Sequence, residues 1–222
     1  MTVDTRELNV AGSWEITPKL FGDARGVFLE WFKEPVFIGA AGHSLNLAQA
    51  NCSVSAAGVL RGIHFAYVPP GQAKYVTCVK GAVLDVVVDI RVGSPTFGTW
   101  DSVLLDDKDR RAIYLSEGLG HAFLSLEDDS TVVYLCSSGY APEREFGINP
   151  LDPEIGIEWP TTSRSGSPLE LTLSEKDASA PFLSEAMAEG QLPKYADAQE
   201  WIDGLTSRRS LDCTPGVKEI HS

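Results

Sequence analysis

The sequence is short of basic residues. Its 222 residues include 18 Lys and Arg against 31 Asp and Glu, which gives a formal net charge of -13. Nucleic acids and anionic membranes attract basic surfaces, so neither is an expected partner of so acidic a chain. A small phosphorylated ligand is not excluded, because a single pocket can be locally basic.

Long apolar runs are missing as well. No run approaches the roughly 20 residues that cross a bilayer, and residues 1–10 lack the apolar core of a signal peptide. The four cysteines form no CxxC pair and lie far apart in sequence: Cys52, Cys78, Cys136 and Cys213. This pattern indicates free thiols in a reducing compartment, so we expect a cytoplasmic protein with no membrane association.

Histidine is equally scarce, with four in the chain: His43, His64, His121 and His221. A mononuclear metal site needs three or four His or carboxylate ligands, commonly with two His separated by one residue. Residues 65–68, which follow His64, include no usual ligand. We therefore expect no metal and no other cofactor.

Short strand-like segments, separated by Gly, Pro, Asp and Asn, fill most of the chain. They are residues 27–33, 46–54, 59–67, 74–80, 83–90, 102–105, 112–115, 121–126 and 131–137. A spacing of roughly 8 to 12 residues is typical of a β-sandwich or barrel and not of βαβ units. We predict an all-β fold, a cupin or jelly-roll barrel over residues 1–160, with hairpins turning near Lys80-Gly81 and through residues 127–130.

The character of the sequence changes after residue 160. A polar, Ser-rich loop leads to two helix-like stretches at residues 184–189 and 196–205. We predict that residues 161–206 form a small helical appendage packed on the barrel. Residues 207–222 show no pattern and are predicted to be a disordered tail.

The segment GVLRGIH, residues 58–64, is a candidate for chemistry. Arg61 and His64 are three residues apart, a spacing that sends them to opposite faces of a regular strand. A bulge at Gly62 would turn both side chains inward. Lys74 follows ten residues later, after a short polar break.

Other polar residues in strand-like segments allow more than one reading. Asp85 and Asp89 are four residues apart and share a face, either as solvated surface or as a carboxylate pair for glycoside cleavage. Tyr134 is either core packing or a proton donor.

Taken in order, these segments resemble the dTDP-4-dehydrorhamnose 3,5-epimerase family. The similarity spans roughly residues 12–180, and its most specific strings are GVLRGIH and DIRVGSPTFG, the latter at residues 89–98. The other matching stretches are residues 23–26, 49–51, 74, 118–123, 140–143, 151–153, 156–160 and 173–177.

The resemblance implies a homodimer that epimerises a dTDP-linked 4-keto-6-deoxyhexose at C3, with C5 as a second candidate carbon. It implies His64 as base, Asp152 as its orienting partner, Tyr134 as acid on the opposite sugar face and Lys74 as support for the oxyanion. The implied substrate-binding residues are Arg25, Glu30, Gln49, Asn51, Arg61, His121, Tyr140, Glu145 and Lys176. It also leaves open that part of the nucleotide pocket comes from the partner across the dimer interface.

The chain departs from the family pattern at a few positions. Leu135 stands where double epimerases usually have Lys, Ala122 stands where Gly is usual, and residues 146–152 differ. In this respect the chain is more similar to the epimerases of antibiotic deoxysugar pathways, some of which invert one carbon. Two alternatives stay open: a sugar-nucleotide ketoisomerase of the same fold, and a catalytically silent cupin that binds sugar nucleotides.

Overall fold

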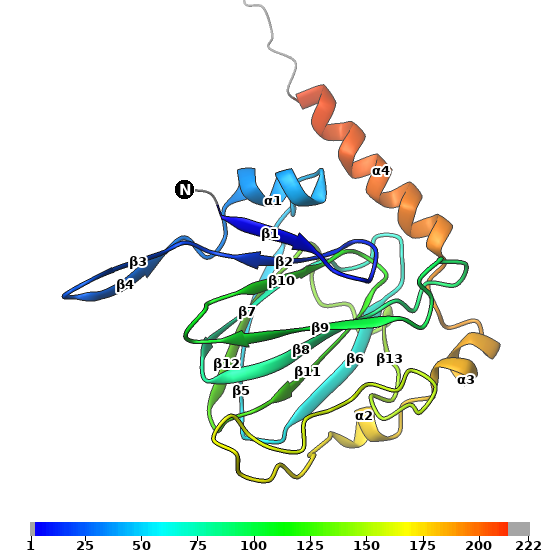
Figure 1. The fold of residues 1–222 in the computed structure, drawn as a ribbon. Coiled ribbons are helices and arrows are strands. Elements are labelled where there is room, and N and C mark those ends of the chain that lie inside the picture. Colours follow the sequence, from blue (N-terminus) through cyan, green and yellow to red (C-terminus); the bar gives the residue numbers. More distant parts are fainter. Residues whose placement is uncertain (1–2, 213–222) are drawn as a thin grey trace, which may run out of the picture.

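The structure is a computed structural model (Figure 1). It describes residues 3–212, with side chains to residue 207. This part of the chain contains thirteen strands and four helices. A six-stranded sheet has the order β1 (Asp4–Glu7), β2 (Ser13–Thr17), β10 (Ala112–Leu115), β7 (Lys74–Lys80), β12 (Ser130–Cys136) and β5 (Gln49–Ser55). A five-stranded sheet has the order β13 (Glu145–Gly147), β6 (Leu60–Ala66), β11 (Gly120–Ser125), β8 (Ala82–Val88) and β9 (Trp100–Asp106). The neighbouring strands of both sheets are antiparallel.

The two sheets pack face to face around one apolar core. Val76 and Val132 of the six-stranded sheet meet Val83, Val87 and Phe123 of the five-stranded sheet in this core. Because side chains alternate along a strand, the residues between them face outward. The predicted all-β jelly-roll architecture is confirmed.

Two connections differ from the prediction. The segments on either side of Lys80-Gly81 were expected to pair as a hairpin, yet β7 and β8 belong to different sheets, and the same holds for β11 and β12. Gly81 has φ +76, and a Cβ there would lie 2.7 Å from the Ser130 hydroxyl. Ser130 in turn donates to the Ala82 carbonyl at 3.0 Å. The two connections therefore contact each other where the chain passes from one sheet to the other. Turn residues do not reveal this arrangement, because it depends on a contact between segments far apart in sequence.

The C-terminal segment covers the outer face of the five-stranded sheet. It contains α2 (Glu175–Ala178), α3 (Leu183–Ala188) and α4 (Tyr195–Asp212). Leu183 and Ala186 pack against Ile63 and Val86 of the sheet. The two predicted helices are confirmed. However, α4 continues to Asp212, beyond its predicted end at residue 205 and into the predicted tail. The rest of that tail, residues 213–222, lies outside the described residues.

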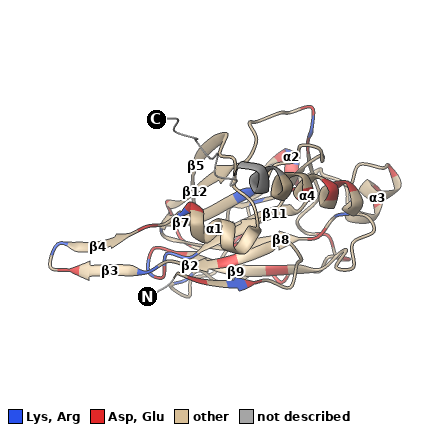
Figure 2. Cartoon of the chain, turned by 90° about the horizontal axis from the view of Figure 1, so that it is seen from above, with Lys and Arg blue, Asp and Glu red and all other residues tan. Residues whose placement is uncertain are grey.

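The N-terminal region contains elements that the sequence did not predict. The helix α1 (Glu34–Ala41) begins with Pro35 in its first turn, a favourable position for proline. The predicted strand at residues 27–33 is shorter: β4 (Gly26–Leu29) pairs only with β3 (Leu20–Asp23). This β3–β4 hairpin projects from the body of the molecule (Figures 1 and 2) and exposes Phe21 and Phe28.

Candidate active site

Arg61 and His64 of β6 both line one pocket. Along the β6–β11 ladder His64 pairs with His121 and Arg61 pairs with Phe123, so β6 carries one extra residue between them. Gly62 has φ +122, and a Cβ at this position would lie 2.5 Å from the Ala122 Cβ. The predicted bulge is confirmed, and it requires glycine.

Asp177 at α2 is the partner of the His64 ring. Its Oδ1 lies 2.7 Å from His64 Nε2, and its own backbone N–H donates to the N-cap Ser174 hydroxyl at 3.1 Å. Burial acts to raise the pKa of Asp177, but the hydrogen bonds and charge of His64 and Ser174 bring it below its ordinary value. An ionised carboxylate at Nε2 keeps the proton of a neutral imidazole on that nitrogen, which leaves the Nδ1 lone pair free to accept another.

The assignment of Asp152 as this partner is wrong. Asp152 is buried, and its carboxylate accepts the backbone N–H of Leu183 at 2.6 Å and that of Glu154 at 2.8 Å. It therefore holds the start of α3. The pattern that signals Asp177 is Ser-x-x-Asp at residues 174–177, a capping sequence that sits within the family-like string 173–177.

Tyr134 lies on the facing sheet. It pairs with Asn51 on one side and Val76 on the other, and its ring packs against the interior core. Burial raises the pKa of the Tyr134 phenol, so the phenol is protonated near neutral pH. Leu135 points the opposite way, into a cluster with Tyr75 on the outer face.

Asp85 and His121 are in contact inside the barrel, and Lys74 is near enough to act on Asp85. His121 Nε2 lies 3.0 Å from both carboxylate oxygens of Asp85, which is fully buried. Burial raises the pKa of Asp85, while the charges of His121 and Lys74 oppose that rise. Burial lowers the pKa of Lys74. None of the three residues lines the pocket, although His121 pairs with His64 along the β6–β11 ladder.

The solvated-surface reading of Asp85 and Asp89 is wrong, since both are fully buried. They do not work as a pair either. Asp89 Oδ1 accepts from Arg91 Nε at 2.9 Å, and Asp89 Oδ2 accepts from Ser94 and Thr96, each at 2.6 Å. Asp89 therefore closes a structural turn, whereas Asp85 holds His121.

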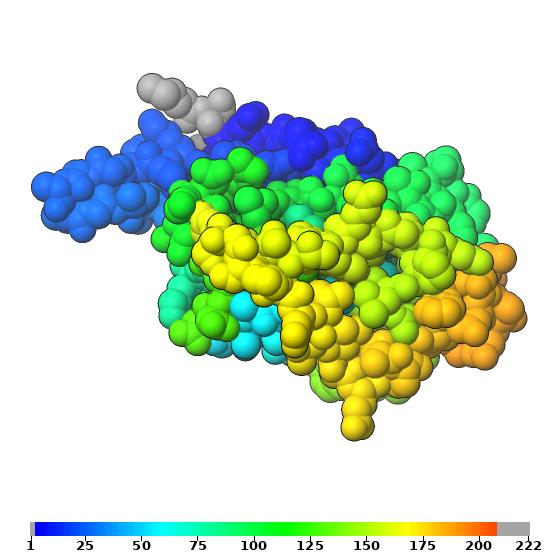
Figure 3. All heavy atoms as spheres, turned by 60° about the horizontal axis from the view of Figure 1, so that its bottom comes forward, coloured from blue at the N-terminus to red at the C-terminus, as the bar shows by residue number. Residues whose placement is uncertain are grey.

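The pocket has a volume of about 460 Å³ and opens beside the C-terminal segment, which lies across the barrel in Figure 3. Its lining residues are Val59, Leu60, Arg61, His64, Tyr140, Glu145, Phe146, Thr172, Leu173, Ser174, Lys176 and Asp177. Five of the sequence-predicted residues are among them: Arg61, His64, Tyr140, Glu145 and Lys176. The pocket thus combines two cations with a histidine–aspartate pair.

Gln49 links Tyr140 of the pocket to Asn51, which is the strand neighbour of Tyr134. Gln49 donates to Asn51 Oδ1 at 2.8 Å and accepts the Tyr140 backbone N–H at 2.9 Å. Tyr140 itself is 65% exposed, so its ring is available to a ligand.

Eight of the thirteen predicted residues do not line this pocket: Lys74, Tyr134, Asp152, Gln49, Asn51, His121, Arg25 and Glu30. The last two belong to the N-terminal hairpin region. Arg25 is at the tip of the projecting β3–β4 hairpin, paired with Asp23, and Glu30 follows the hairpin and pairs with Lys33 at 2.7 Å. Neither lines the pocket of its own chain.

Among residues 3–207, no group of three or more His, Cys, Asp or Glu side chains is arranged to hold a metal ion. No helix in this described part of the chain is long and apolar enough to cross a membrane.

Comparison with known proteins agrees with the geometry. Residues 7–185 match the family dTDP-4-dehydrorhamnose 3,5-epimerase. The chain is 64% identical to the Mycolicibacterium smegmatis dTDP-4-dehydrorhamnose 3,5-epimerase, over 93% of this chain and 98% of that protein. It is 57% identical to a dTDP-4-dehydrorhamnose 3-epimerase of Streptomyces niveus, over 87% and 90% of the two chains.

Solved structures give the same result. The RmlC epimerase of Mycobacterium tuberculosis superposes with a TM-score of 0.86 at 56% identity, covering 91% of this chain and 99% of that one. ChmJ, a 3'-monoepimerase of Streptomyces bikiniensis in complex with dTDP-quinovose, gives 0.85 at 50% identity, covering 90% and 98%. This chain therefore belongs to the dTDP-4-dehydrorhamnose 3,5-epimerase family.

Proposed function

We propose that this protein is an isomerase that epimerises a dTDP-linked 4-keto-6-deoxyhexose at C3. The observation that carries the proposal is the placement of His64 on one sheet, held by Asp177 of α2, and of Tyr134 on the other sheet, with a pocket of about 460 Å³ at the His64 side. Epimerisation needs a base and an acid on opposite faces of the sugar, because a proton returned from the same side restores the substrate.

In this mechanism His64 takes the proton from the carbon next to the ketone. Its Nδ1 accepts the proton, and the buried Asp177 carboxylate stabilises the imidazolium that forms. The electron pair left on carbon moves onto the ketone oxygen and gives an enediolate. A positioned donor at such an oxygen is typically worth about 2.7–4 kcal/mol, and Lys74 and His121 are the candidates inside the barrel.

Tyr134 then protonates the enediolate from the other face. Its raised pKa suits this role, because the phenol still carries its proton when the enediolate forms. Lys74 lies on the neighbouring strand, and its positive charge would stabilise the phenolate that remains.

For the nucleotide end we propose Arg61 and Lys176 as contacts of the phosphates and Tyr140 as a stacking surface for the base. All three line the pocket. Arg61 and Lys176 thus bring two cations to the pocket of a chain whose net charge is -13, and the pocket also holds the carboxylates of Glu145 and Asp177.

We further propose a homodimer in which the β3–β4 hairpin inserts into the partner's pocket. The hairpin exposes Phe21 (46%) and Phe28 (67%) in the single chain, an apolar surface that association would bury. Arg25 and Glu30 would then complete the nucleotide site of the other subunit. A cytoplasmic location remains our expectation, supported by the free thiols of Cys52, Cys78 and Cys136.

Proton NMR of the sugar nucleotide in D2O with pure enzyme tests the proposal. Deuterium should enter at C3 together with inversion there, and exchange at C5 would add that carbon to the reaction. A product with its carbonyl moved to another carbon would identify a ketoisomerase. Binding of dTDP without any exchange would identify a silent binding protein.

A further inference from the structure

The pocket depends on a segment that lies outside the barrel. Five of its twelve lining residues, Thr172, Leu173, Ser174, Lys176 and Asp177, belong to the C-terminal segment that crosses the barrel surface (Figure 3). The segment therefore has to be held in a fixed position for Lys176 and Asp177 to meet residues of β6.

Close to the pocket, backbone hydrogen bonds attach this segment to the start of β6. Leu60 N–H donates to the Thr172 carbonyl at 2.9 Å, and Thr172 N–H donates to the Gly58 carbonyl at 2.9 Å. Leu173 packs against the buried cluster that contains Leu60. Only Leu173 stands between Thr172 and the α2 N-cap Ser174, so a shift of Thr172 moves the helix that carries Asp177.

Upstream of Thr172 the chain forms a tight loop closed by its own backbone hydrogen bonds. Thr162 and Pro168 form an antiparallel bridge, and Ser163 N–H donates to the Ser167 carbonyl at 2.7 Å. Leu169 N–H donates to the Thr161 carbonyl at 2.9 Å, so the loop leads directly into the strand-like run toward Thr172.

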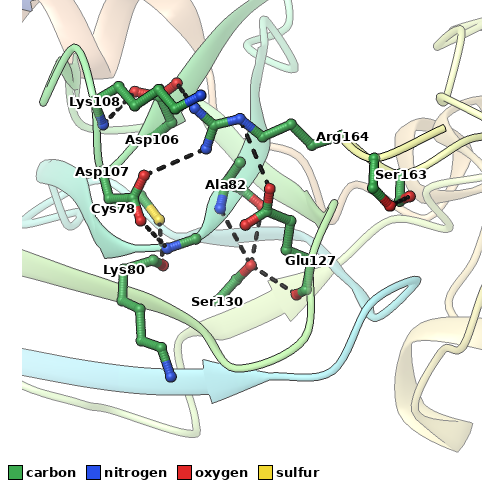
Figure 4. A network of polar contacts seen from close by, with 12 residues as sticks. Cys78, Lys80, Ala82, Asp106, Asp107, Lys108, Glu127, Ser130, Ser163 and Arg164 are labelled. Atoms are coloured by element: carbon green, nitrogen blue, oxygen red, sulfur yellow. Dashed lines mark hydrogen bonds and ion pairs between the residues drawn. The ribbon is translucent and has the colours of Figure 1, made fainter. Parts of the chain in front are cut away.

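Arg164 in this loop joins three carboxylates of the barrel (Figure 4). Its Nη2 lies 2.9 Å from Asp106 Oδ2, its Nη1 lies 3.3 Å from Asp107 Oδ1, and its Nε lies 3.7 Å from Glu127 Oε1. The Arg164 side chain is only 21% exposed. One guanidinium therefore contacts three carboxylates. The planar arginine side chain can do this because its N–H groups point in several directions, whereas the compact ammonium of a lysine cannot.

The three acids are themselves fixed in the connections between the sheets. Asp107 Oδ2 accepts the Gly81 N–H at 3.0 Å, and Asp106 Oδ1 accepts the N–H groups of Lys108 and Asp109 at 3.0 and 2.7 Å. The Glu127 carbonyl accepts the Ser130 hydroxyl at 2.8 Å. The loop is thus anchored to the rigid part of the barrel, and the anchor lies outside the pocket.

We propose that Arg164 is a positioning residue for the epimerisation site. Its three ion pairs fix the loop at residues 161–168, the loop fixes Thr172, and Thr172 fixes the start of α2, so that Asp177 meets His64 and Lys176 faces the pocket. The inference rests on the proposed function for its kinetic readout, but it also predicts effects on the His64 ring and on dTDP binding.

The test compares Arg164→Ala with Arg111→Ala in the full chain. Arg111 is the control because it is also part-buried and pairs with two carboxylates, Glu15 of β2 and Asp109 of the β9–β10 connection, neither of which belongs to the loop at residues 161–168. Arg164→Ala should lower kcat/KM by about tenfold or more, since a misplacement of about 1 Å can cost 10²-fold. It should also weaken dTDP binding and shift the ¹⁵N resonance of His64 Nε2, which reports the hydrogen bond to Asp177.

Arg164→Lys keeps the charge but cannot reach all three acids, so it should give intermediate values. Glu127→Gln removes only the longest ion pair, and it replaces Arg164→Ala if that variant does not fold. The proposal is overturned if the Arg164 variants change only the melting temperature while kcat/KM, dTDP affinity and the His64 resonance match those of Arg111→Ala. If the wild-type enzyme shows no exchange at all, the proposed function fails, but the resonance and the dTDP affinity still test the anchor.

Discussion

At the scale of single residues, the chemistry depends on which aspartate meets His64. Asp177 does so at 2.7 Å, whereas Asp152 is used to begin a helix. Two carboxylates of the same kind therefore have separable roles, one in orienting the imidazole and one in holding the appendage.

We predict that Asp177→Asn lowers the rate of C3 exchange by about 10²–10⁴, because the amide no longer fixes the tautomer or stabilises the imidazolium. Asp152→Asn should lower the melting temperature and leave the exchange rate per folded molecule within a few fold. Deuterium exchange followed by NMR, with folded fractions from circular dichroism, measures both. The reverse order of effects would return the orienting role to Asp152.

The same ion pair predicts a pH dependence of stability. The pKa of Asp177 in the folded chain lies below its ordinary value of 3.8. Its contribution is therefore present above about pH 3.8 and is lost as the pH falls through the folded-state pKa. The melting temperature of wild type should exceed that of Asp177→Asn near neutral pH, and the gap should close on acidification. A gap that stays constant down to the acid limit would show that the carboxylate charge is not involved.

A Tyr134 variant should distinguish removal of the proton from inversion of the carbon. Tyr134→Phe keeps the ring that packs against the interior core but removes the donor. The variant should still exchange deuterium at C3, while epimer formation slows by about 10²–10⁴. Proton NMR follows the two signals in one sample. Epimer formation near the wild-type rate would leave the acid unidentified.

At the scale of elements, the bulge in β6 brings Arg61 and His64 into one pocket. We predict that Gly62→Ala destabilises the fold by about 1–3 kcal/mol and lowers activity, because the new Cβ meets Ala122 and the His121 carbonyl within 2.6 Å. Gly93→Ala is the control, since Gly93 also has positive φ (+87) but its Cβ would enter open space. Urea denaturation measures both variants, and equal losses of stability would argue against the clash at Gly62.

At the scale of the whole molecule, Arg25 lies on the projecting hairpin and not in the pocket of its own chain. If the hairpin completes the partner's pocket, mixing Arg25→Ala with His64→Asn should restore activity. Half of the dimers then combine the two variants, and each of those has one complete site, so about a quarter of wild-type activity is expected. No gain on mixing, after subunit exchange is verified by mass spectrometry, would place Arg25 in its own chain's site or outside any site.

Local patterns in the sequence predict much of the fold. Strand spacing predicts the two-sheet architecture, and the helix patterns after residue 160 predict α3 and α4. The strands β1, β2 and β3 and the helix α1 were missed. For β2 and α1 the reason is that Ile16 and Phe37 are stabilised by packing in a cluster on the barrel more than by local pattern. The two sheet crossings were read as hairpins, since a turn residue signals a change of direction but not the sheet that the next strand joins.

Spacing along one strand and glycine geometry are local properties, so the residue types of the site and the bulge that brings Arg61 and His64 into one pocket can be predicted from the sequence. It also determined the family, through strings that keep their order along the chain. Three features follow from the tertiary structure alone: Asp177 meets His64 across 113 positions of sequence, Asp85 is buried against His121, and Leu135 packs on the outer face. Those contacts depend on how two sheets and an appendage pack in space, and neither spacing nor composition specifies such a packing.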